Sequence, residues 1–189
     1  MNKTIKSNIK EHQDVIQKMF DFEDSIFEIS KVMINALKRK KTIFWCGNGG
    51  SASDSQHLAG ELIGRFNGDR RPLKSIALNS DSSVMTCIAN DYGYNYLFSR
   101  QLEGLGSKGD ILIGITTSGN SQNVVNAFIS AKKIGMKTIG FLGRDGGKAK
   151  KLVEKYILIP SYSTARIQEM HILIGHILCE LIEEGLDLK

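Results

Sequence analysis

The sequence predicts a three-layer α/β/α sandwich with a parallel sheet, preceded by a helical extension at the N-terminus. Short apolar runs of strand length alternate with longer segments of helical pattern, which is typical of a parallel sheet covered on both faces. The apolar runs are continuous, as expected of strands that are buried on both sides. With 189 residues the chain is also long enough for one domain that buries roughly 70% of its unfolded surface.

Residues 7–40 come first and have a helical pattern, with more apolar positions than a single narrow stripe requires. We therefore expect one helix or two that cover a neighbouring surface, such as that of another subunit. This predicts an N-terminal helical extension over residues 1–40 that packs on the oligomer, followed by one domain over residues 41–189.

Beyond this extension, strands and helices alternate to the end of the chain. The expected strands are 42–46, 75–78, 111–115, 137–142 and 156–159, and the expected helices are about 53–66, 121–134 and 164–184. The first and third strands end in turns of small polar residues, and the last helix is strongly apolar. Ligands of open parallel sheets bind at such turns, beyond the carboxyl ends of the strands.

Composition and charge exclude several classes of protein. The three cysteines, Cys46, Cys87 and Cys179, form no CxxC pair, which favours a reducing cytoplasm over a disulfide framework or a thiolate zinc site. The N-terminus has no secretory pattern, and no apolar run approaches the ~18 residues of a membrane span. The net charge of +5 is densest at residues 38–41, where a helix is expected to end, so we interpret this cluster as a helix end. We expect a cytoplasmic protein without a nucleic-acid or membrane partner.

The first polar turn has the sequence CGNGGSASD and covers residues 46–54. Its glycines allow a ligand to approach the backbone closely, and Asn48 and Ser51 supply hydrogen bonds. The pattern is neither GxGxxG nor a P-loop, so no nucleotide cofactor is expected. A purely structural turn is the alternative.

The second turn, TTSGNS, places four hydroxyl groups around a glycine, directly before a helix. These are Thr116, Thr117, Ser118 and Ser121. Free backbone N–H groups and the positive end of the helix dipole add to the hydroxyl donors, which favours an anion site that needs no lysine. The alternative is a plain helix cap made by one serine. Four hydroxyls exceed what a cap requires, so we predict a phosphate site.

Two expected helices carry residues suited to proton transfer. His57 and Glu61 are spaced i, i+4, so they share one helix face. Gln168 and His176 are eight apart on the apolar last helix, about 80° apart around its axis, where an inward polar group must find a partner or a function. His171 lies roughly 140° from His176 and is predicted to be structural. A carboxylate and an imidazole can isomerise an aldose and a ketose, and the four residues could also hold zinc, but spacing alone does not bring the helices together.

Four segments of the sequence resemble those of the phosphoheptose isomerases, the sedoheptulose 7-phosphate isomerases of the SIS family. The segments are CGNGGSASDSQHLAGELIGR (46–65), the pair Asn90-Asp91 in IANDYGYNYLFSRQ, GITTSGNSQNV (114–124) and ARIQEMHILIGHILCELIE (165–183). The resemblance extends from about residue 10 to the C-terminus. Its motifs are specific in combination, since other SIS domains share the serine loop but not the RIQExH element.

The resemblance implies conversion of sedoheptulose 7-phosphate to D-glycero-D-manno-heptose 7-phosphate through an enediol(ate), the first step toward bacterial ADP- or GDP-heptose. Glu61 would be the general base and His176 its acid–base partner. Zinc, one ion per subunit, would be held by His57, Glu61, Gln168 and His176. The sugar would contact Asn48, Gly49, Gly50, Ser51, Asn90, Asp91 and the ligands Glu61 and Gln168, and the phosphate would contact Thr116, Thr117, Ser118 and Ser121.

The family also implies a homotetramer with active sites shared between chains, which suits the apolar N-terminal helix. Two departures are visible: Thr116 stands where many relatives have Ser, and Ala165 stands where some carry Asp.

Two alternative functions remain open. One is a noncatalytic SIS protein that binds the bacterial replication initiator. The presence of all four candidate metal ligands argues against this alternative. The other is a sensor or an isomerase of another phosphosugar, since the length of the substrate cannot be derived from these residues.

Overall fold

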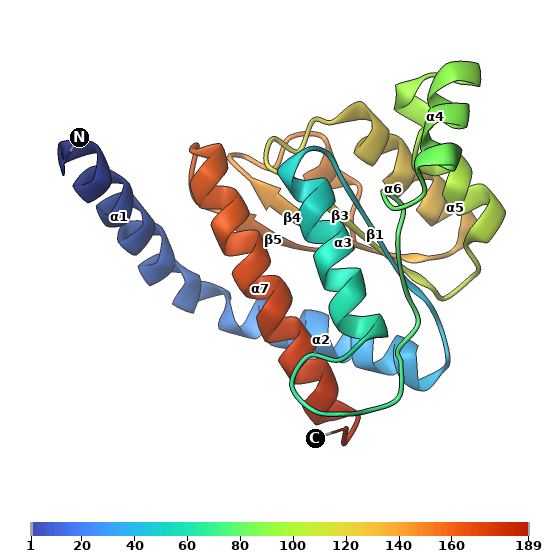
Figure 1. The fold of residues 1–189 in the computed structure, drawn as a ribbon, viewed down its shortest axis with the longest axis horizontal. Helices are drawn as coiled ribbons and strands as arrows, with labels where there is room; N and C mark the ends of the chain where they lie inside the picture. The colour runs from blue at the N-terminus through green and yellow to red at the C-terminus, as the bar shows by residue number, and fades with distance from the viewer. Residues whose placement is uncertain (1, 189) are drawn as a thin grey trace.

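Five parallel strands form the central sheet of the computed structural model, which describes residues 2–188 (Figure 1). Their order in the sheet is β2-β1-β3-β4-β5. The strands are β1 (Ile43–Gly47), β2 (Ser75–Ala77), β3 (Ile111–Thr116), β4 (Lys137–Gly143) and β5 (Lys155–Ile159). β1 and β3 are buried along their whole length, which is the environment that their continuous apolar runs predicted. The predicted parallel α/β sandwich is confirmed.

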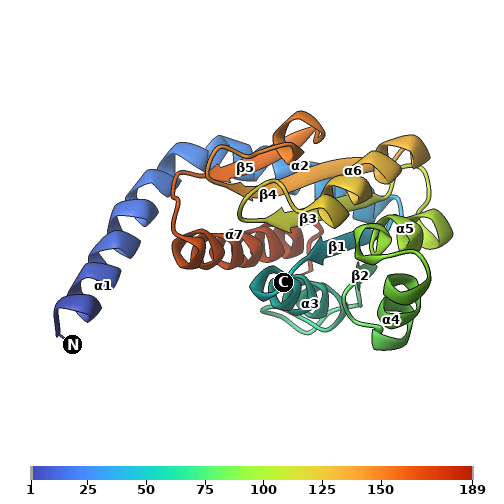
Figure 2. The same cartoon turned by 90° about the horizontal axis from the view of Figure 1, so that it is seen from above.

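Helices cover both faces of the sheet. One apolar core joins inward residues such as Trp45 and Ile113 to helices α2 (Glu23–Lys38), α3 (Gly50–Ile63) and α7 (Thr164–Gly185). The other core joins alternate strand residues such as Phe44 and Leu112 to helices on the opposite face. Those helices are α4 (Ser82–Asp91), α5 (Ser99–Leu105) and α6 (Gln122–Ile134), and the view of Figure 2 shows α5 and α6 on one side of β3 and α7 on the other.

Two of these helices were not anticipated. No element was expected between residues 79 and 110, where α4 and α5 lie. These helices are only ten and seven residues long, so their apolar positions cover too few turns to be recognised as an amphipathic pattern.

The N-terminal segment consists of α1 (Asn2–Gln17), the short 3-10 helix η1 (Lys18–Phe22) and α2. α2 contributes Ile29 and Met33 to the core of its own chain. α1 buries only Val15 and projects away from the body of the molecule, as Figure 1 shows. The division of the chain at residues 40 and 41 stays a prediction. None of the described helices is long and apolar enough to cross a membrane.

α3 and α7 lie side by side in front of the sheet and run in the same direction (Figure 1). Gly50 of α3 contacts Gln168 of α7, and Leu58 contacts Gly175 about two turns further along both helices. A Cβ added to Gly175 would lie 2.5 Å from the methyl carbons of Leu58, so glycine at this position lets the two helices approach closely. This matched register places residues 57 and 61 of α3 at the height of residue 176 of α7.

A buried ion pair fastens the C-terminal end of α3 to α7. Arg70 Nε lies 2.8 Å from Glu183 Oε1, and the two side chains are only 1% and 0% exposed. The guanidinium also donates to the carbonyl oxygens of Glu61 and Leu62, and the carboxylate accepts the backbone N–H of Phe66. Burial alone would raise the pKa of the Glu183 carboxyl, but the N–H groups at residues 66 and 67 and the guanidinium outweigh it and hold the pKa below its ordinary value.

We expect Glu183→Gln to lower the free energy of unfolding by about 3–5 kcal/mol, because it leaves the Arg70 guanidinium buried without its charged partner. Urea unfolding followed by circular dichroism measures this change. Glu154→Gln is the matched control, since Glu154 pairs with Lys137 at the surface, where its side chain is 42% exposed. The control should change stability by less than about 0.5 kcal/mol.

The contribution of the Arg70–Glu183 pair to the free energy of unfolding is expected to depend on pH. Because the folded-state pKa of Glu183 lies below the unfolded value of 4.5, its contribution is present above that pH and is lost as the pH falls through the folded-state pKa. Wild-type stability should therefore decline more steeply in acid than that of Glu183→Gln. Parallel stability curves for the two proteins would contradict this assignment.

Candidate active site

The two polar turns lie next to each other at the carboxyl edge of the sheet. β1 and β3 are neighbours in the sheet, with Gly47 opposite Ile115, so the turns that follow them emerge side by side. The carboxamides of Asn48, in the first turn, and Asn123, at the start of the helix α6 that follows the second turn, form reciprocal hydrogen bonds of 2.9 and 2.8 Å. The structure thus brings the predicted sugar turn and the predicted phosphate turn together.

In the first turn, Gly49 and Gly50 are exposed and α3 begins at Gly50. Gly49 has φ +57°, a conformation that favours glycine. Ser51 is buried, and a Cβ on Gly47 would collide with it, so this serine packs the turn tightly against the strand. The exposed backbone of residues 49 and 50 at a helix N-terminus is able to donate hydrogen bonds to a ligand.

In the second turn, Thr116 Oγ1 lies 3.2 Å from Ser121 Oγ, and Ser118 Oγ accepts the Asn120 N–H. Ser121 stands at the N-cap of α6, yet its side chain makes no capping hydrogen bond. Thr117 and Ser118 are half-buried. This arrangement speaks against the plain helix cap and leaves hydroxyl groups at the N-terminus of a 13-residue helix, where an anion is stabilised.

Gly119 determines the shape of this second turn. It has φ +66°, and a Cβ at this position would lie 1.9 Å from the carbonyl oxygen of Gly146. No larger residue fits, because the atom that it would meet belongs to the backbone. The Ala149 N–H donates to the Gly119 carbonyl, which holds the turn against the segment that follows β4.

Three of the predicted metal ligands converge between α3 and α7. His57 Nε2 lies 2.9 Å from His176 Nε2 and 3.3 Å from Glu61 Oε1. One ligand atom of each of the three residues lies within 4.8 Å of the other two. The sequence could not show that the two helices meet, and the structure brings them together at this cluster, which we call the triad.

The triad fits a metal ion. Two imidazole nitrogens and one carboxylate oxygen form a donor set that divalent transition metals accept. The side chain of His57 is 49% exposed, so a fourth coordination position can open toward solvent or a ligand.

Phe66 and Arg70 hold the triad in place, and sequence reasoning did not identify either of them. The Phe66 ring stacks on His176 with centroids 5.5 Å apart, and Arg70 binds the backbone carbonyl of Glu61. Both belong to the segment after α3, whose charges and lone aromatic look like an ordinary surface loop in the sequence. Their partner Glu183 lies 113 residues after Arg70 and 117 after Phe66, so no local signal reveals these contacts.

Asp54 is a third residue that sequence reasoning missed. It lies one turn before His57 on α3, and its Oδ2 atom is buried without a hydrogen-bond partner among the described residues. Burial raises the pKa of this carboxyl to about 6, and the positive charge of His57 opposes that rise. The spacing 54, 57 and 61 forms a polar stripe on an otherwise mixed helix, which is the signal that could have revealed it.

The remaining candidates lie around the triad and the turns. The carboxamide of Gln168 packs over Gly50, at the first residue of α3, about two helix turns before the triad. Asn90 and Asp91 are exposed at the end of α4, where the first donates to the second at 2.7 Å. Three residues further on, the hydroxyl of Tyr94 contacts Asn48 at 2.9 Å and links this segment to the sugar turn.

His171 lies outside the triad, as predicted. It is fully buried, and its Nε2 atom lies 3.1 Å from the carbonyl oxygen of Leu142 in β4. Burial lowers the pKa of its imidazole to about 4, which keeps the ring neutral and structural at pH 7.

Comparison with known proteins supports the fold and identifies the family. The family model of the SIS domain matches residues 8–143. The phosphoheptose isomerase of Nitratiruptor sp. is 54% identical over 96% of this chain and 97% of its own length. A phosphoheptose isomerase of Helicobacter pylori is 49% identical over 95% of this chain and 94% of its own length.

Solved structures agree with the sequence comparison. The phosphoheptose isomerase of Neisseria gonorrhoeae superposes with a TM-score of 0.92 at 37% identity, over 97% of this chain and 98% of that chain. The phosphoheptose isomerase of Francisella tularensis superposes with a TM-score of 0.94 at 33% identity, over 96% of this chain and 97% of that chain. With similarity of this extent in both sequence and structure, the chain belongs to the phosphoheptose isomerase family of SIS-domain proteins.

Proposed function

We propose that the chain is an aldose–ketose isomerase that converts sedoheptulose 7-phosphate into D-glycero-D-manno-heptose 7-phosphate. The observation that carries the proposal is that the side chains of Glu61 and His176 meet in the triad, which is partly exposed. The two residues lie 115 positions apart in the chain and come from different helices. A carboxylate and an imidazole so placed are the groups that an enediol(ate) mechanism requires. The names of the relatives supply the seven-carbon substrate.

Glu61 and His176 divide the proton transfers between them. The Glu61 carboxylate takes a proton from C1 of the ketose, beside the C2 carbonyl, and returns it to C2 of the enediol(ate). His176 donates a proton to the C2 oxygen as its double bond opens, and removes one from the C1 oxygen as the aldehyde forms. The product keeps every atom of the substrate, and its carbonyl has moved by one carbon.

The two turns would bind the rest of the substrate. The sugar is proposed to contact Asn48, Gly49, Gly50 and Ser51 of the first turn, and Asn90 and Asp91 at the end of α4. Thr116, Thr117, Ser118 and Ser121 are proposed to hold the phosphate. The N-terminus of α6, which the Ser121 side chain does not cap, supports the phosphate position, since the dipole of the helix favours an anion there.

We propose zinc as the metal, held by His57, Glu61 and His176. Zinc prefers nitrogen and oxygen ligands of this kind, and when bound it would polarise the substrate carbonyl. Gln168 stays a proposed fourth ligand, from this chain or a neighbouring one, because its carboxamide lies over Gly50 in this chain.

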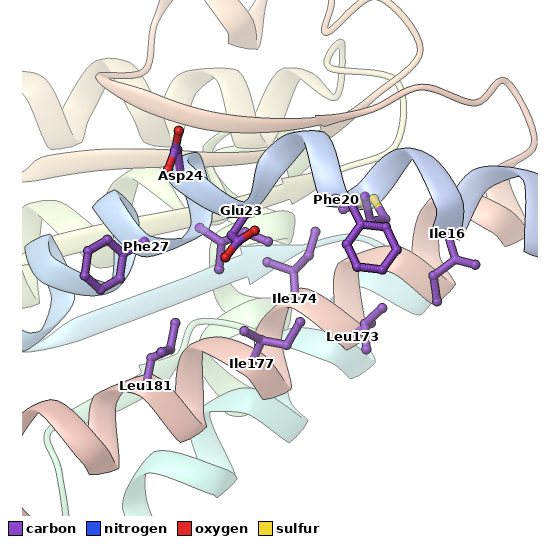
Figure 3. Close-up of a pocket in the computed structure, with 11 residues that line it drawn as sticks. Ile16, Phe20, Glu23, Asp24, Phe27, Leu173, Ile174, Ile177 and Leu181 are labelled. Carbon is purple, nitrogen blue, oxygen red and sulfur yellow. The ribbon is translucent and has the colours of Figure 1, made fainter.

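A homotetramer with shared sites is proposed as the working form, in the cytoplasm. An apolar groove of about 690 Å³ lies between the N-terminal helices and α7. Figure 3 shows the side chains that line it. Its lining includes Phe20 and Phe27, which are 75% and 50% exposed, facing Leu173, Ile177 and Leu181. Apolar residues of this size so exposed mark a surface that another chain covers. A second copy is the proposed occupant.

Glu61→Gln should abolish isomerisation, by at least about 10³-fold in kcat, because the amide cannot accept the proton from the sugar carbon. Turnover of sedoheptulose 7-phosphate, followed by analysis of the product sugar, measures this. Unfolding stability should stay near that of the wild type. Glu154→Gln, at a surface pair remote from α3, should keep full activity. Near-wild-type turnover by Glu61→Gln would remove this carboxylate from the mechanism.

Dialysis against a chelator should abolish activity, and zinc should restore it, because the metal polarises the carbonyl. Metal analysis should find one zinc per chain in the wild type and none in His57→Ala. His12→Ala is the matched control, since His12 lies on α1 and contacts Glu169. Full activity in metal-free protein would contradict the zinc proposal, and equal metal loss in both variants would remove His57 from the ligands.

Phe20→Asp should dissociate the assembly, because it places a charge in the apolar groove. Sedimentation of the purified protein measures the mass. Ile129→Asp on α6, where the side chain is 37% exposed outside the groove, is the control and should leave the mass unchanged. A wild-type protein that sediments as a monomer would overturn the tetramer.

A further inference from the structure

A short chain of hydrogen bonds determines which atoms face the sugar turn. The backbone N–H of Val124 donates to Asn123 Oδ1 at 2.9 Å. A backbone N–H can only donate, so the atom that it meets must be the carboxamide oxygen. The nitrogen of this carboxamide therefore points toward Asn48. Because Asn123 is only 2% exposed, solvent does not compete for these bonds.

The orientation of Asn123 determines that of Asn48. Asn123 Nδ2 donates to Asn48 Oδ1, and Asn48 Nδ2 donates in return to Asn123 Oδ1. The reversed orientation of Asn48 would place two oxygens and two NH₂ groups face to face, which leaves both pairs without a bond. The Oδ1 atom of Asn48 is thus an acceptor in a known direction.

Tyr94 adds a second hydrogen bond to the same oxygen, at 2.9 Å. Since Asn48 Oδ1 can only accept, the phenolic hydroxyl must donate its single proton there. The lone pairs of the Tyr94 oxygen are then its only remaining hydrogen-bonding capacity. One N–H of Asn48 Nδ2 also remains beyond the bond to Asn123, because an NH₂ group has two donors.

Tyr94 is held in position to use this capacity. It begins the 3-10 helix η2 (Tyr94–Tyr96), which is anchored to α6 where Asn126 Nδ2 donates to the carbonyl oxygen of Asn95 at 2.9 Å. The Tyr94 side chain is exposed, and its hydroxyl ends at the turn that precedes α3. A donor on Asn48 and an acceptor on Tyr94 therefore stand on either side of one carboxamide.

We propose that Tyr94 is a sugar-binding residue, whose phenolic oxygen accepts a hydrogen bond from one hydroxyl group of the substrate. The remaining N–H of Asn48 lies on the other side of the carboxamide and donates to a different oxygen of the sugar. A carbonyl or ether oxygen cannot donate a hydrogen bond to Tyr94. This residue thus discriminates a polyhydroxylated chain from a less hydroxylated phosphate ester. The proposal rests on the proposed function, in which Asn48 faces the sugar.

Tyr94→Phe tests the proposal, because it removes one oxygen and keeps the ring. We expect KM for sedoheptulose 7-phosphate to rise about 5- to 10-fold, the effect of one lost hydrogen bond, with kcat within about twofold of the wild type. Tyr96→Phe makes the same deletion two residues away in η2 and should leave KM unchanged. Inhibition by inorganic phosphate, which has no sugar hydroxyl, should be equal in Tyr94→Phe and the wild type.

Three results would overturn the role of Tyr94. These are an unchanged KM in Tyr94→Phe, an equal rise in Tyr96→Phe, or a parallel loss of phosphate inhibition, which would indicate a general disturbance of the turns. Failure of the proposed function is a separate observation, namely a wild-type protein that does not turn over this sugar phosphate. In that case the affinity of both proteins for the same compound is measured by calorimetry. Equal affinity of the wild type and Tyr94→Phe, or no binding by either, would overturn the Tyr94 proposal.

Discussion

The buried pair of Arg70 and Glu183 is the constraint that connects the fold to the chemistry. Its guanidinium bonds to the carbonyl of Glu61, and its carboxylate binds the N–H of Phe66, whose ring stacks on His176. One ion pair therefore contacts the backbone of Glu61 directly and the ring of His176 through Phe66. Charges without access to water are held rigidly by their partners, so the position of the triad follows from the pair.

The order of the strands has a similar role at the other end of α3. Because β1 and β3 are adjacent and parallel, two turns far apart in the sequence emerge beside each other. The carboxamide of Asn123, at the start of α6, then forms two hydrogen bonds with that of Asn48 in the first turn. Helix α3 runs from this turn to the triad, so one rigid element separates the proposed sugar site from the proposed site of proton transfer by about two turns.

The sequence was sufficient for features that depend on local pattern, and insufficient for those that depend on partners. Continuous apolar runs predicted β1 and β3, and the i, i+4 spacing predicted the shared face of His57 and Glu61. The parallel register of α3 and α7 could not be predicted, because it depends on the small size of Gly175 against Leu58. The same limit applies to Glu183, which the sequence presents as one more surface acid on an exposed helix end, and to the position of Gln168 over Gly50.

The placement of the triad across two helices links ligand chemistry to folding. Residues 57 and 176 lie 119 positions apart, and their imidazoles meet only when both helices are docked. An ion bound there would therefore crosslink a loop that spans most of the chain, and it would bind the native state alone. By mass action, each tenfold increase in free ion above its dissociation constant would add about 1.4 kcal/mol to the free energy of unfolding. The metal site would then also stabilise the fold, in a way that removal of the ion reverses.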